Sequence, residues 1–536
     1  MKKKVLSVLL AASISVTPLW GCSSQNPSDN SQESSQTAGG EEEPITISWL
    51  AYQTDAQPDP DSKIVKAVEE RYNVKFDFWF VDNQKWDDTL NVRFAAGEMP
   101  DVFRLKTKGN LNKYVQQGVV GELPIEMIEE KAPNYMKMVE EYDTENLMWM
   151  PTRINGKNYG FTFPAIRNTY PTSLVWRLDW LKAVGIDKVP ETLEEFETAM
   201  YKFAKEDPDG NGVDDTYGLS NTVMGTVLGS FGPMAIRDFK GNPLPDLRWQ
   251  RDGEGVKLSA LTEETRQGLE LLQKWYRDGV IDPEFITGEN TGGYWALSQA
   301  FINGRVGVTG NVMYDHWVPP LSEGDLGGSV YQEFIKVNPD LVYGEDFILG
   351  TAPVGPEGVS GTDLWGYVSE TMVLSSQCVK DQKKVDIILQ MLDDFVADEE
   401  YSMMIRHGFE GEDYILGEDG SVIPQVTDSA ARVQKGIQVF TFLSSIPEYE
   451  KKYSPKLYEF ADANKGTGHV ILPVPSTDAA TQYLTTLQTL TVEYFTKIVT
   501  GEYSIDQFDE YVEKMRQNGA DELEKQTSEA WIAQQE

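Results

Sequence analysis

The sequence predicts an α/β protein whose first sheet is parallel. Ile45–Leu50 alternates apolar and polar residues as a strand does, and Val74–Phe78 alternates again. Between them, Ser62 stands where a helix cap is expected, followed by Ile64 and Val68 on one helical face. A strand–helix–strand order of this kind is typical of parallel sheets covered by helices.

Helices and strands continue to alternate along the rest of the chain. Thr192 and Glu195 have the spacing of a capping box, and Leu193, Phe196 and Met200 follow at steps of three and four. No repeat of fixed period is visible in the sequence. Further helical patterns cover 262–278, 381–396, 480–500 and 504–518, and strand-like segments cover 305–309 and 367–374.

The composition is that of a large, acidic globular protein. The 536 residues include 85 Asp and Glu against 47 Lys and Arg, a formal charge of -38. Hydrophobic residues make up 40% and aromatic residues 11%, which excludes a disordered chain and a multi-span membrane protein. The negative charge argues against nucleic acid as a partner, because phosphate binding depends on Lys and Arg. With only 2 cysteines, a disulfide scaffold or a four-cysteine zinc site is excluded.

The first 21 residues read as a secretory signal. Three lysines precede a short apolar run, Val5–Val16, which is too short to span a bilayer. Leu19-Trp20-Gly21-Cys22 resembles a bacterial lipobox, so we expect Cys22 to be lipidated, with palmitate among its acyl chains, and to become the new N-terminus. A plain signal peptide with an incidental cysteine is the alternative. The Ser/Gln/Asn/Gly-rich residues up to Pro44 predict a flexible tether to the outer face of the membrane.

Seven short segments carry a family resemblance. In chain order they are Gly97–Val102, Asn155–Gly160, Trp176–Leu181, Asp207–Gly212, Gly279–Phe285, Phe301–Gly307 and Gly408–Gly411. Together, and behind a lipobox, they resemble the carbohydrate-type family 1 extracellular solute-binding proteins of bacterial ABC importers, which are abundant in Bacillus- and Paenibacillus-like bacteria. The resemblance extends from about residue 45 to the C-terminus.

The resemblance implies a fold and a function. The fold is the two-lobed, type II periplasmic-binding-protein-like α/β fold, with hinge crossings between the lobes and a ligand cleft between them. The function is that of a receptor that delivers an oligosaccharide or glycan fragment to the transmembrane subunits of an ABC permease. The receptor is expected to be a monomer and to contact the membrane only through its lipid. The expected boundaries are 1–21 for the signal, 22–44 for the tether, 45–165 and 353–408 for the first lobe, and 166–352 and 409–536 for the second, with 165–172 as the first hinge.

Sugar ligands predict a particular kind of site. Aromatic side chains cover the apolar faces of sugar rings, and Asp, Asn, Glu or Arg bind the hydroxyls. Such residues belong on loops at the ends of strands, and each aromatic among them has core packing as its alternative role. Trp176 and Trp180 read as structural. The candidates for ligand contact are Tyr52, Asp55, Tyr170, Trp295, Asn311, Tyr314, Trp317 and Trp365.

An acidic loop predicts a structural calcium site. Its candidate ligands are Asp207, Asp209, Asn211, the backbone carbonyl of Val213, and Asp215. These residues have the spacing of the first nine positions of an EF-hand loop, where alternate residues turn oxygens inward. Gly218 stands where that loop has a bidentate Glu, so the pattern is incomplete. The alternative is an acidic surface turn.

Two other functions remain open at this stage. A secreted glycosidase or lyase could use paired carboxylates, although 85 acidic residues make chance pairs common. The chain carries no His-Glu-x-x-His, Gly-x-Ser-x-Gly or Walker motif, and we expect binding without turnover. A lipoprotein that senses a peptide or sugar for a membrane regulator is the third reading. Cys378, without a partner once Cys22 is lipidated, predicts a small buried apolar residue.

Overall fold

The computed structural model describes residues 43–51, 55–82, 85–106, 110–143, 145–239, 244–286, 298–322, 324–366, 371–442 and 446–535, apart from the side chains of residues 311 and 312. Residues from Pro44 onward belong to one structural unit. Within that unit, buried apolar side chains form two sets of cores, which we call the first and the second lobe.

The first lobe is built on a four-stranded sheet in the order β12-β3-β1-β2. β1 (Ile45–Leu50) runs parallel to β2 (Val74–Trp79) and to β3 (Val102–Leu105), and β12 (Thr371–Leu374) is antiparallel to β3. α1 (Lys63–Tyr72) joins β1 to β2, and Ser62 caps it by accepting a hydrogen bond from the backbone N of Val65. The predicted parallel strand–helix–strand unit is therefore confirmed.

Residues far apart in the sequence fill the core of the first lobe. Trp49 is fully buried, its ring lies 5.8 Å from that of Phe440, and its indole N–H donates to the carbonyl of Val439 at 2.9 Å. The other elements of this lobe are α2 (Trp86–Ala95), α3 (Asn110–Gln116), α4 (Ile125–Lys131), α5 (Pro133–Tyr142), β4 (Arg153–Ile154), β5 (Lys157–Asn158), α14 (Gln382–Ala397), α15 (Glu399–His407), β13 (Tyr414–Leu416), β14 (Val422–Pro424), α16 (Ser429–Gln434) and α17 (Pro447–Tyr453).

The second lobe has a smaller, antiparallel sheet in the order β10-β6-β9. Trp176 and Trp180 are buried in its core, as expected of structural residues. Thr192 and Glu195 form the predicted capping box at the start of α7. The elements of this lobe are β6 (Ser173–Arg177), α6 (Leu178–Ala183), α7 (Leu193–Lys205), α8 (Asn221–Gly229), β7 (Trp249–Asp252), β8 (Gly255–Leu258), α9 (Glu263–Arg277), α11 (Gln299–Ile302), β9 (Val308–Val312), α12 (Tyr314–Trp317), α13 (Ser329–Val337), β10 (Phe347–Gly350), α18 (Pro455–Ala463), α19 (Asp478–Val499), α20 (Gln507–Gln517) and α21 (Ala520–Gln535).

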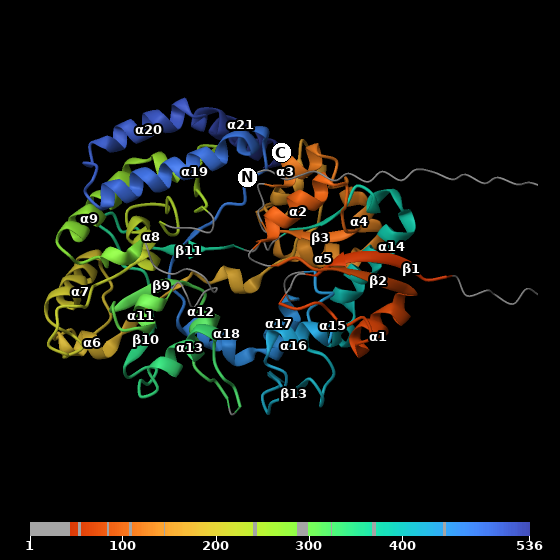
Figure 1. Cartoon of the computed structure of the whole chain (residues 1–536), viewed down its shortest axis with the longest axis horizontal. Coiled ribbons are helices and arrows are strands. Elements are labelled where there is room, and N and C mark those ends of the chain that lie inside the picture. Colours follow the sequence, from red (N-terminus) through yellow and green to blue (C-terminus); the bar gives the residue numbers. More distant parts are fainter. Residues whose placement is uncertain are drawn as a thin grey trace, which may run out of the picture. The chain divides into compact units, whose positions relative to one another are not determined.

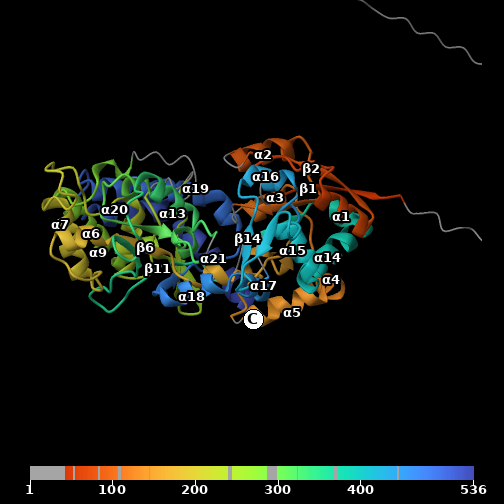
Figure 2. The ribbon, with the colours of Figure 1, turned by 90° about the horizontal axis from the view of Figure 1, so that it is seen from below.

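Three segments pass between the lobes. The first contains the 3-10 turn η3 (Ile166–Thr169), the second contains β11 (Thr362–Leu364), and the third lies between α17 and α18. Figure 1 shows α6–α9 and α19 on one side of these segments and α1–α5 and α14 on the other. In Figure 2, α17 and α18 meet where the two sides join.

The later crossings differ from the expected boundaries. Val433, Ile437 and Phe440 pack in the first lobe, so this lobe keeps the chain well beyond residue 408. The reason is the aromatic cluster around Trp49. The rings of Phe440 and Phe442 pack against its indole, and the carbonyl of Val439 accepts a hydrogen bond from the indole N–H. The second lobe likewise extends past residue 352, because β11 pairs in parallel with β15 (Gly468–Val470).

Candidate functional site

One arginine lies at the junction of the lobes. Arg167, on η3, forms ion pairs with Asp315 of α12 at 3.0 Å and with Glu450 of α17. Burial lowers the pKa of Arg167, but the charges of Glu450 and Asp315 outweigh it and raise the pKa well above its usual value. A single guanidinium therefore connects the first crossing to an element of each lobe.

Tyr170 lies on the same crossing, where the sequence predicted a ligand contact. Its ring is 5.1 Å from that of Tyr314 in an edge-to-face arrangement, and its hydroxyl donates to Asp462 at 2.8 Å. The ammonium of Lys465 is 5.4 Å from the centre of the Tyr170 ring. These contacts fix the ring at the junction, and its contact with a ligand stays a prediction.

Several buried polar atoms at the junction have no hydrogen-bond partner among the described residues. Among them are the hydroxyl of Tyr314, whose residue is 2% exposed, the Oδ1 of Asp315 and the indole nitrogen of Trp365. Trp365 follows β11, and the next residue, Gly366, donates its backbone N–H to the carbonyl of Asn168 on the first crossing at 3.0 Å. Because buried polar groups in native proteins are nearly always hydrogen-bonded, water or a ligand has to supply these bonds.

Trp317 packs in the core. It is 0% exposed, with its ring 5.6 Å from that of Phe301 and 5.5 Å from that of Phe334. No face of the indole is open to a sugar, so the structure assigns Trp317 to the packing role that was its alternative.

The remaining candidates are spread along the chain. Asp55 is exposed, and it accepts a hydrogen bond from the hydroxyl of Ser429 at the start of α16. Asn311 lies on β9, and its side chain is outside the described part of the structure. Tyr52 and Trp295 lie outside the described residues altogether.

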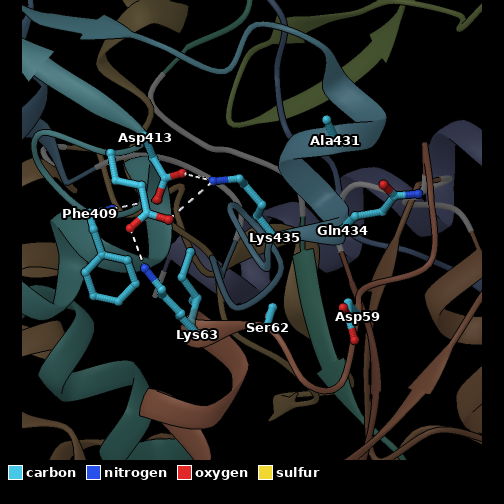
Figure 3. A pocket seen from close by; sticks show the side chains of 10 residues that line it. Asp59, Ser62, Lys63, Phe409, Asp413, Ala431, Gln434 and Lys435 are labelled. Carbon is cyan, nitrogen blue, oxygen red and sulfur yellow. Dashed lines mark hydrogen bonds and ion pairs between the residues drawn. The ribbon is translucent and has the colours of Figure 1, made fainter.

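A pocket of about 380 Å³ opens on the first lobe (Figure 3). Three segments line it: the start of α1, the loop before β13, and α16. Sequence analysis missed this pocket, although Ser62 and the Gly408–Gly411 motif were both noted, because only folding brings the two together. The lining residues are Asp59, Ser62, Lys63, Ile64, Phe409, Glu412, Asp413, Ala431, Gln434 and Lys435.

Four of the five charged side chains that line this pocket form ion pairs, and Asp59 is the fifth. The ammonium of Lys63 is 2.5 Å from Glu412, and that of Lys435 is 2.5 Å from Asp413. Figure 3 shows both amines turned toward these carboxylates beside the ring of Phe409. An aromatic ring beside paired charges suits a polar molecule.

The acidic loop forms a tight turn held by its own side chains. Gly212 has a φ of 79° and donates its backbone N–H to Asp207 at 3.0 Å, while the amide of Asn211 donates to Asp209 at 2.8 Å. Burial, then the neighbouring Asp207 and Asp215, raise the pKa of Asp209. In the part of the chain that the structure describes, no group of three or more His, Cys, Asp or Glu side chains is arranged to hold a metal.

Two further expectations concern the chain as a whole. Cys378 is fully buried, and burial raises the pKa of its thiol to about 12, which agrees with the packing role expected for it. Among the described helices, none combines the length and the apolar character needed to span a membrane. Cys22 lies outside the described residues.

Comparison with known proteins finds relatives of full length. No family model matches the chain. Lipoprotein LipO of Bacillus subtilis (strain 168) is 26% identical, with 98% of this chain and 97% of that protein aligned. The polygalacturonan/rhamnogalacturonan-binding protein YtcQ of the same strain is 24% identical, with 99% of each chain aligned.

Solved structures share the fold. The alginate-binding protein AlgQ2 without calcium ion superposes with a TM-score of 0.65 at 17% identity, over 92% of this chain and 98% of that chain. An extracellular solute-binding protein from Bifidobacterium longum subsp. infantis gives 0.64 at 17% identity, with the same coverage. The chain is similar over its whole length to these two Bacillus proteins and has the type II fold of the solute-binding proteins. In this fold its two lobes are joined at the crossings around Arg167.

Proposed function

We propose that this protein is the extracellular receptor of an ABC importer, binding an oligosaccharide at the lobe junction and delivering it to the permease. The observation that carries the proposal is the meeting of aromatic rings and unpartnered polar atoms at the crossings. Tyr170 and Trp365 offer apolar faces, and Tyr314 and Asp315 offer a hydroxyl and a carboxylate oxygen. That combination suits a sugar, whose ring faces are apolar and whose rim is polar.

The names of similar proteins support a glycan ligand and a receptor. YtcQ is named for binding polygalacturonan and rhamnogalacturonan, AlgQ2 for binding alginate, and FusA of S. pneumoniae is described as an ABC-transporter substrate-binding protein in complex with kestose. All three are described as binding proteins, which favours a receptor over the glycosidase or lyase.

A glycan library tests the function. The protein should gain thermal stability with one oligosaccharide class, because a ligand at 100 times its Kd stabilises the folded state by about 2.7 kcal/mol. Calorimetry should give one site for each chain, and the bound sugar should show no new reducing ends. Catalytic release of reducing ends would instead support the enzyme, and the absence of any glycan binding would contradict the proposal.

A lipid anchor at Cys22 is part of the same proposal. Its support is the lipobox-like Leu19–Cys22 segment and the name of LipO, a lipoprotein aligned over nearly its whole length. Replacing Cys22 with Ala should release the protein from the membrane fraction or leave its precursor unprocessed. Membrane fractionation unchanged from the wild type would contradict the anchor.

The proposal also includes a calcium ion bound in the 207–215 loop. Two similar proteins support it: the structure of AlgQ2 is described as being without calcium ion, and one FusA structure is of an EF-hand mutant. In this chain Asp207, Asp209 and Asp215 would supply carboxylate oxygens, Asn211 its amide oxygen and Val213 its carbonyl. Such an ion would offset the effect of burial and of the neighbouring carboxylates, which raise the pKa of Asp209, and it would stabilise the turn.

A further inference from the structure

The two lobes also touch away from the three crossings. α3 of the first lobe packs against the start of α19 of the second lobe. Figure 1 shows α3 on the side of its lobe that faces α19 and α21. Neither α3 nor α19 belongs to a crossing segment, so the connection of the chain does not by itself hold this contact together.

Asn112 is the buried residue of this contact, with only 3% of its surface exposed. Its Nδ2 donates to Oδ1 of Asp478 at 2.7 Å and to the hydroxyl of Thr481 at 3.4 Å. Its backbone N–H donates to the hydroxyl of Ser476 at 3.3 Å, and Gln116, one turn further along α3, donates to the same Oδ1 of Asp478 at 2.5 Å. Both acceptors of the Asn112 amide therefore come from the other lobe, and a rotation that separates the lobes breaks these bonds.

The acceptor is held in place by its own helix. Asp478 is the first residue of α19, and Thr477 caps that helix by accepting a hydrogen bond from the backbone N of Ala480. A carboxylate in the first turn of a helix is stabilised by the positive end of the helix dipole. Hydrogen bonds to a carboxylate are also roughly twice as strong as those between neutral groups. Asp478 is therefore a strong, fixed acceptor that two amides of the first lobe share.

The contact lies at the carboxyl edge of the first sheet. β3 ends at Leu105 and α3 begins at Asn110, so α3 starts close to the carboxyl end of β3. β1, β2 and β3 run parallel, and ligands of open α/β sheets bind outside the carboxyl ends of the strands. A movement that closes the lobes over this edge therefore also brings α3 against α19.

We propose that Asn112, Gln116 and Asp478 form an interlobe latch, which raises the fraction of molecules whose lobes are together before any ligand binds. The latch concerns the lobes themselves, and only its effect on affinity rests on the proposed function. If the ligand binds the closed form, its apparent affinity is reduced by the fraction of molecules that are open. The three latch residues are then positioning residues, which strengthen binding without touching the ligand.

Small-angle X-ray scattering of the ligand-free protein tests the latch. Asn112→Asp replaces the donor with a second carboxylate facing Asp478, so the radius of gyration should increase, and high salt should reduce the increase by screening the repulsion. Combining Asn112→Asp with Asp478→Asn restores one donor and one acceptor and should return the radius of gyration to that of the wild type. Gln517→Glu, which adds the same charge at an exposed position on α20, should leave it unchanged.

A milder variant guards against loss of folding. Asp478→Ala removes the acceptor from an exposed position without adding a charge, and it should also increase the radius of gyration. Circular dichroism of each variant shows that the lobes themselves remain folded. A radius of gyration equal to that of the wild type in both Asn112→Asp and Asp478→Ala, or an increase that persists in the combined variant, overturns the latch.

Calorimetry separates the latch from the receptor function. The probes are maltotetraose and tetragalacturonate, a neutral and an acidic oligosaccharide. Asn112→Asp should weaken the binding of whichever probe binds the wild type by about tenfold, the effect of losing one hydrogen bond to a charged group, and the combined variant should recover it. Unchanged affinity in Asn112→Asp overturns the positioning role. If no glycan binds the wild type, the receptor function and the positioning role fail together, whereas the scattering of the ligand-free variants still decides whether the latch exists.

Discussion

Arg167 and Asp315 form an ion pair of 3.0 Å that joins the first chain crossing to a helix of the second lobe. The same guanidinium pairs with Glu450 on a helix of the first lobe, so one side chain contacts both lobes at the point where the chain passes between them. We expect the lobes to close on a ligand by rotating against each other. Such a rotation has to keep or exchange these pairs, so we expect Arg167 to act as a pivot residue.

Arg167→Met should destabilise the protein. The change leaves the buried carboxylate of Glu450 and that of Asp315 without their cation, and such a loss costs about 1–3 kcal/mol. Urea unfolding should therefore show a lower midpoint. Arg277→Met is the control: the side chain of Arg277 is exposed and pairs with its neighbour Asp278, so the change should alter stability by less than about 0.5 kcal/mol. Equal midpoints for the two variants would contradict the role of Arg167.

Substitutions at Trp317 and at Trp365 should affect different properties, stability in the first case and ligand binding in the second. Trp317→Ala removes a fully buried indole and should cost about 3–5 kcal/mol of stability. Trp365→Ala should instead weaken oligosaccharide binding, by about 5- to 150-fold in Kd for a lost contact of about 1–3 kcal/mol. Thermal melting and calorimetry on both variants test the pair. If Trp317→Ala keeps the stability of the wild type, the packing role of Trp317 is wrong. If Trp365→Ala keeps the affinity of the wild type, the binding role of Trp365 is wrong.

Local patterns made part of the fold predictable. The caps at Ser62 and Thr192 and the alternation of Ile45–Leu50 depend on neighbours within a few residues, and all three form as expected. The antiparallel sheet of the second lobe and the long return of the chain into the first lobe depend instead on distant pairings. Trp49, for example, bonds to a carbonyl 390 residues away.

The same distinction limits what the sequence says about the site. The sequence placed Tyr170 at the first crossing because a family motif precedes it, but it gave no sign of the role of Arg167, since the partners of Arg167 lie 148 and 283 residues away. Ligand contact and core packing are both compatible with the sequence around Trp317. The packing of Phe301 and Phe334 against its ring decides between the two roles.

The stability of the folded protein should decrease as the pH is lowered, and part of that decrease depends on His407. The folded protein holds this imidazole neutral, with a pKa of about 3 against 6.5 in the unfolded chain. Below about pH 6.5 protons therefore bind the unfolded chain preferentially, so the stability is present above that pH and is lost progressively toward pH 3. Between about pH 7 and about pH 5.5 the loss should be about 1.3 kcal/mol.

His407→Gln, which cannot titrate, supplies the comparison. Denaturant unfolding at the two pH values should show a smaller drop for the variant than for the wild type, since the other titrating groups are common to both. An identical drop would contradict the burial of a neutral imidazole beside Arg406 and Arg432.

Calcium should raise the melting temperature through the 207–215 loop. Extracellular calcium sites bind with a Kd on the order of 10⁻⁴ to 10⁻³ M, so millimolar calcium should give a measurable shift that EDTA reverses. Asp209→Ala should lose the shift while it keeps its sugar binding. If calorimetry finds no calcium heat in the wild type and EDTA leaves the melting temperature unchanged, the loop is an acidic turn only.

Small-angle X-ray scattering with and without a bound oligosaccharide tests the central claim most directly, because a receptor that holds its ligand at the lobe junction has to close around it. Closure requires that the ligand bind the closed state more tightly than the open one. At saturating ligand the radius of gyration should decrease, and Trp365→Ala, measured at the same ligand concentration, should keep more of the open form. A radius of gyration that is identical with and without saturating ligand would contradict binding at the junction by lobe closure.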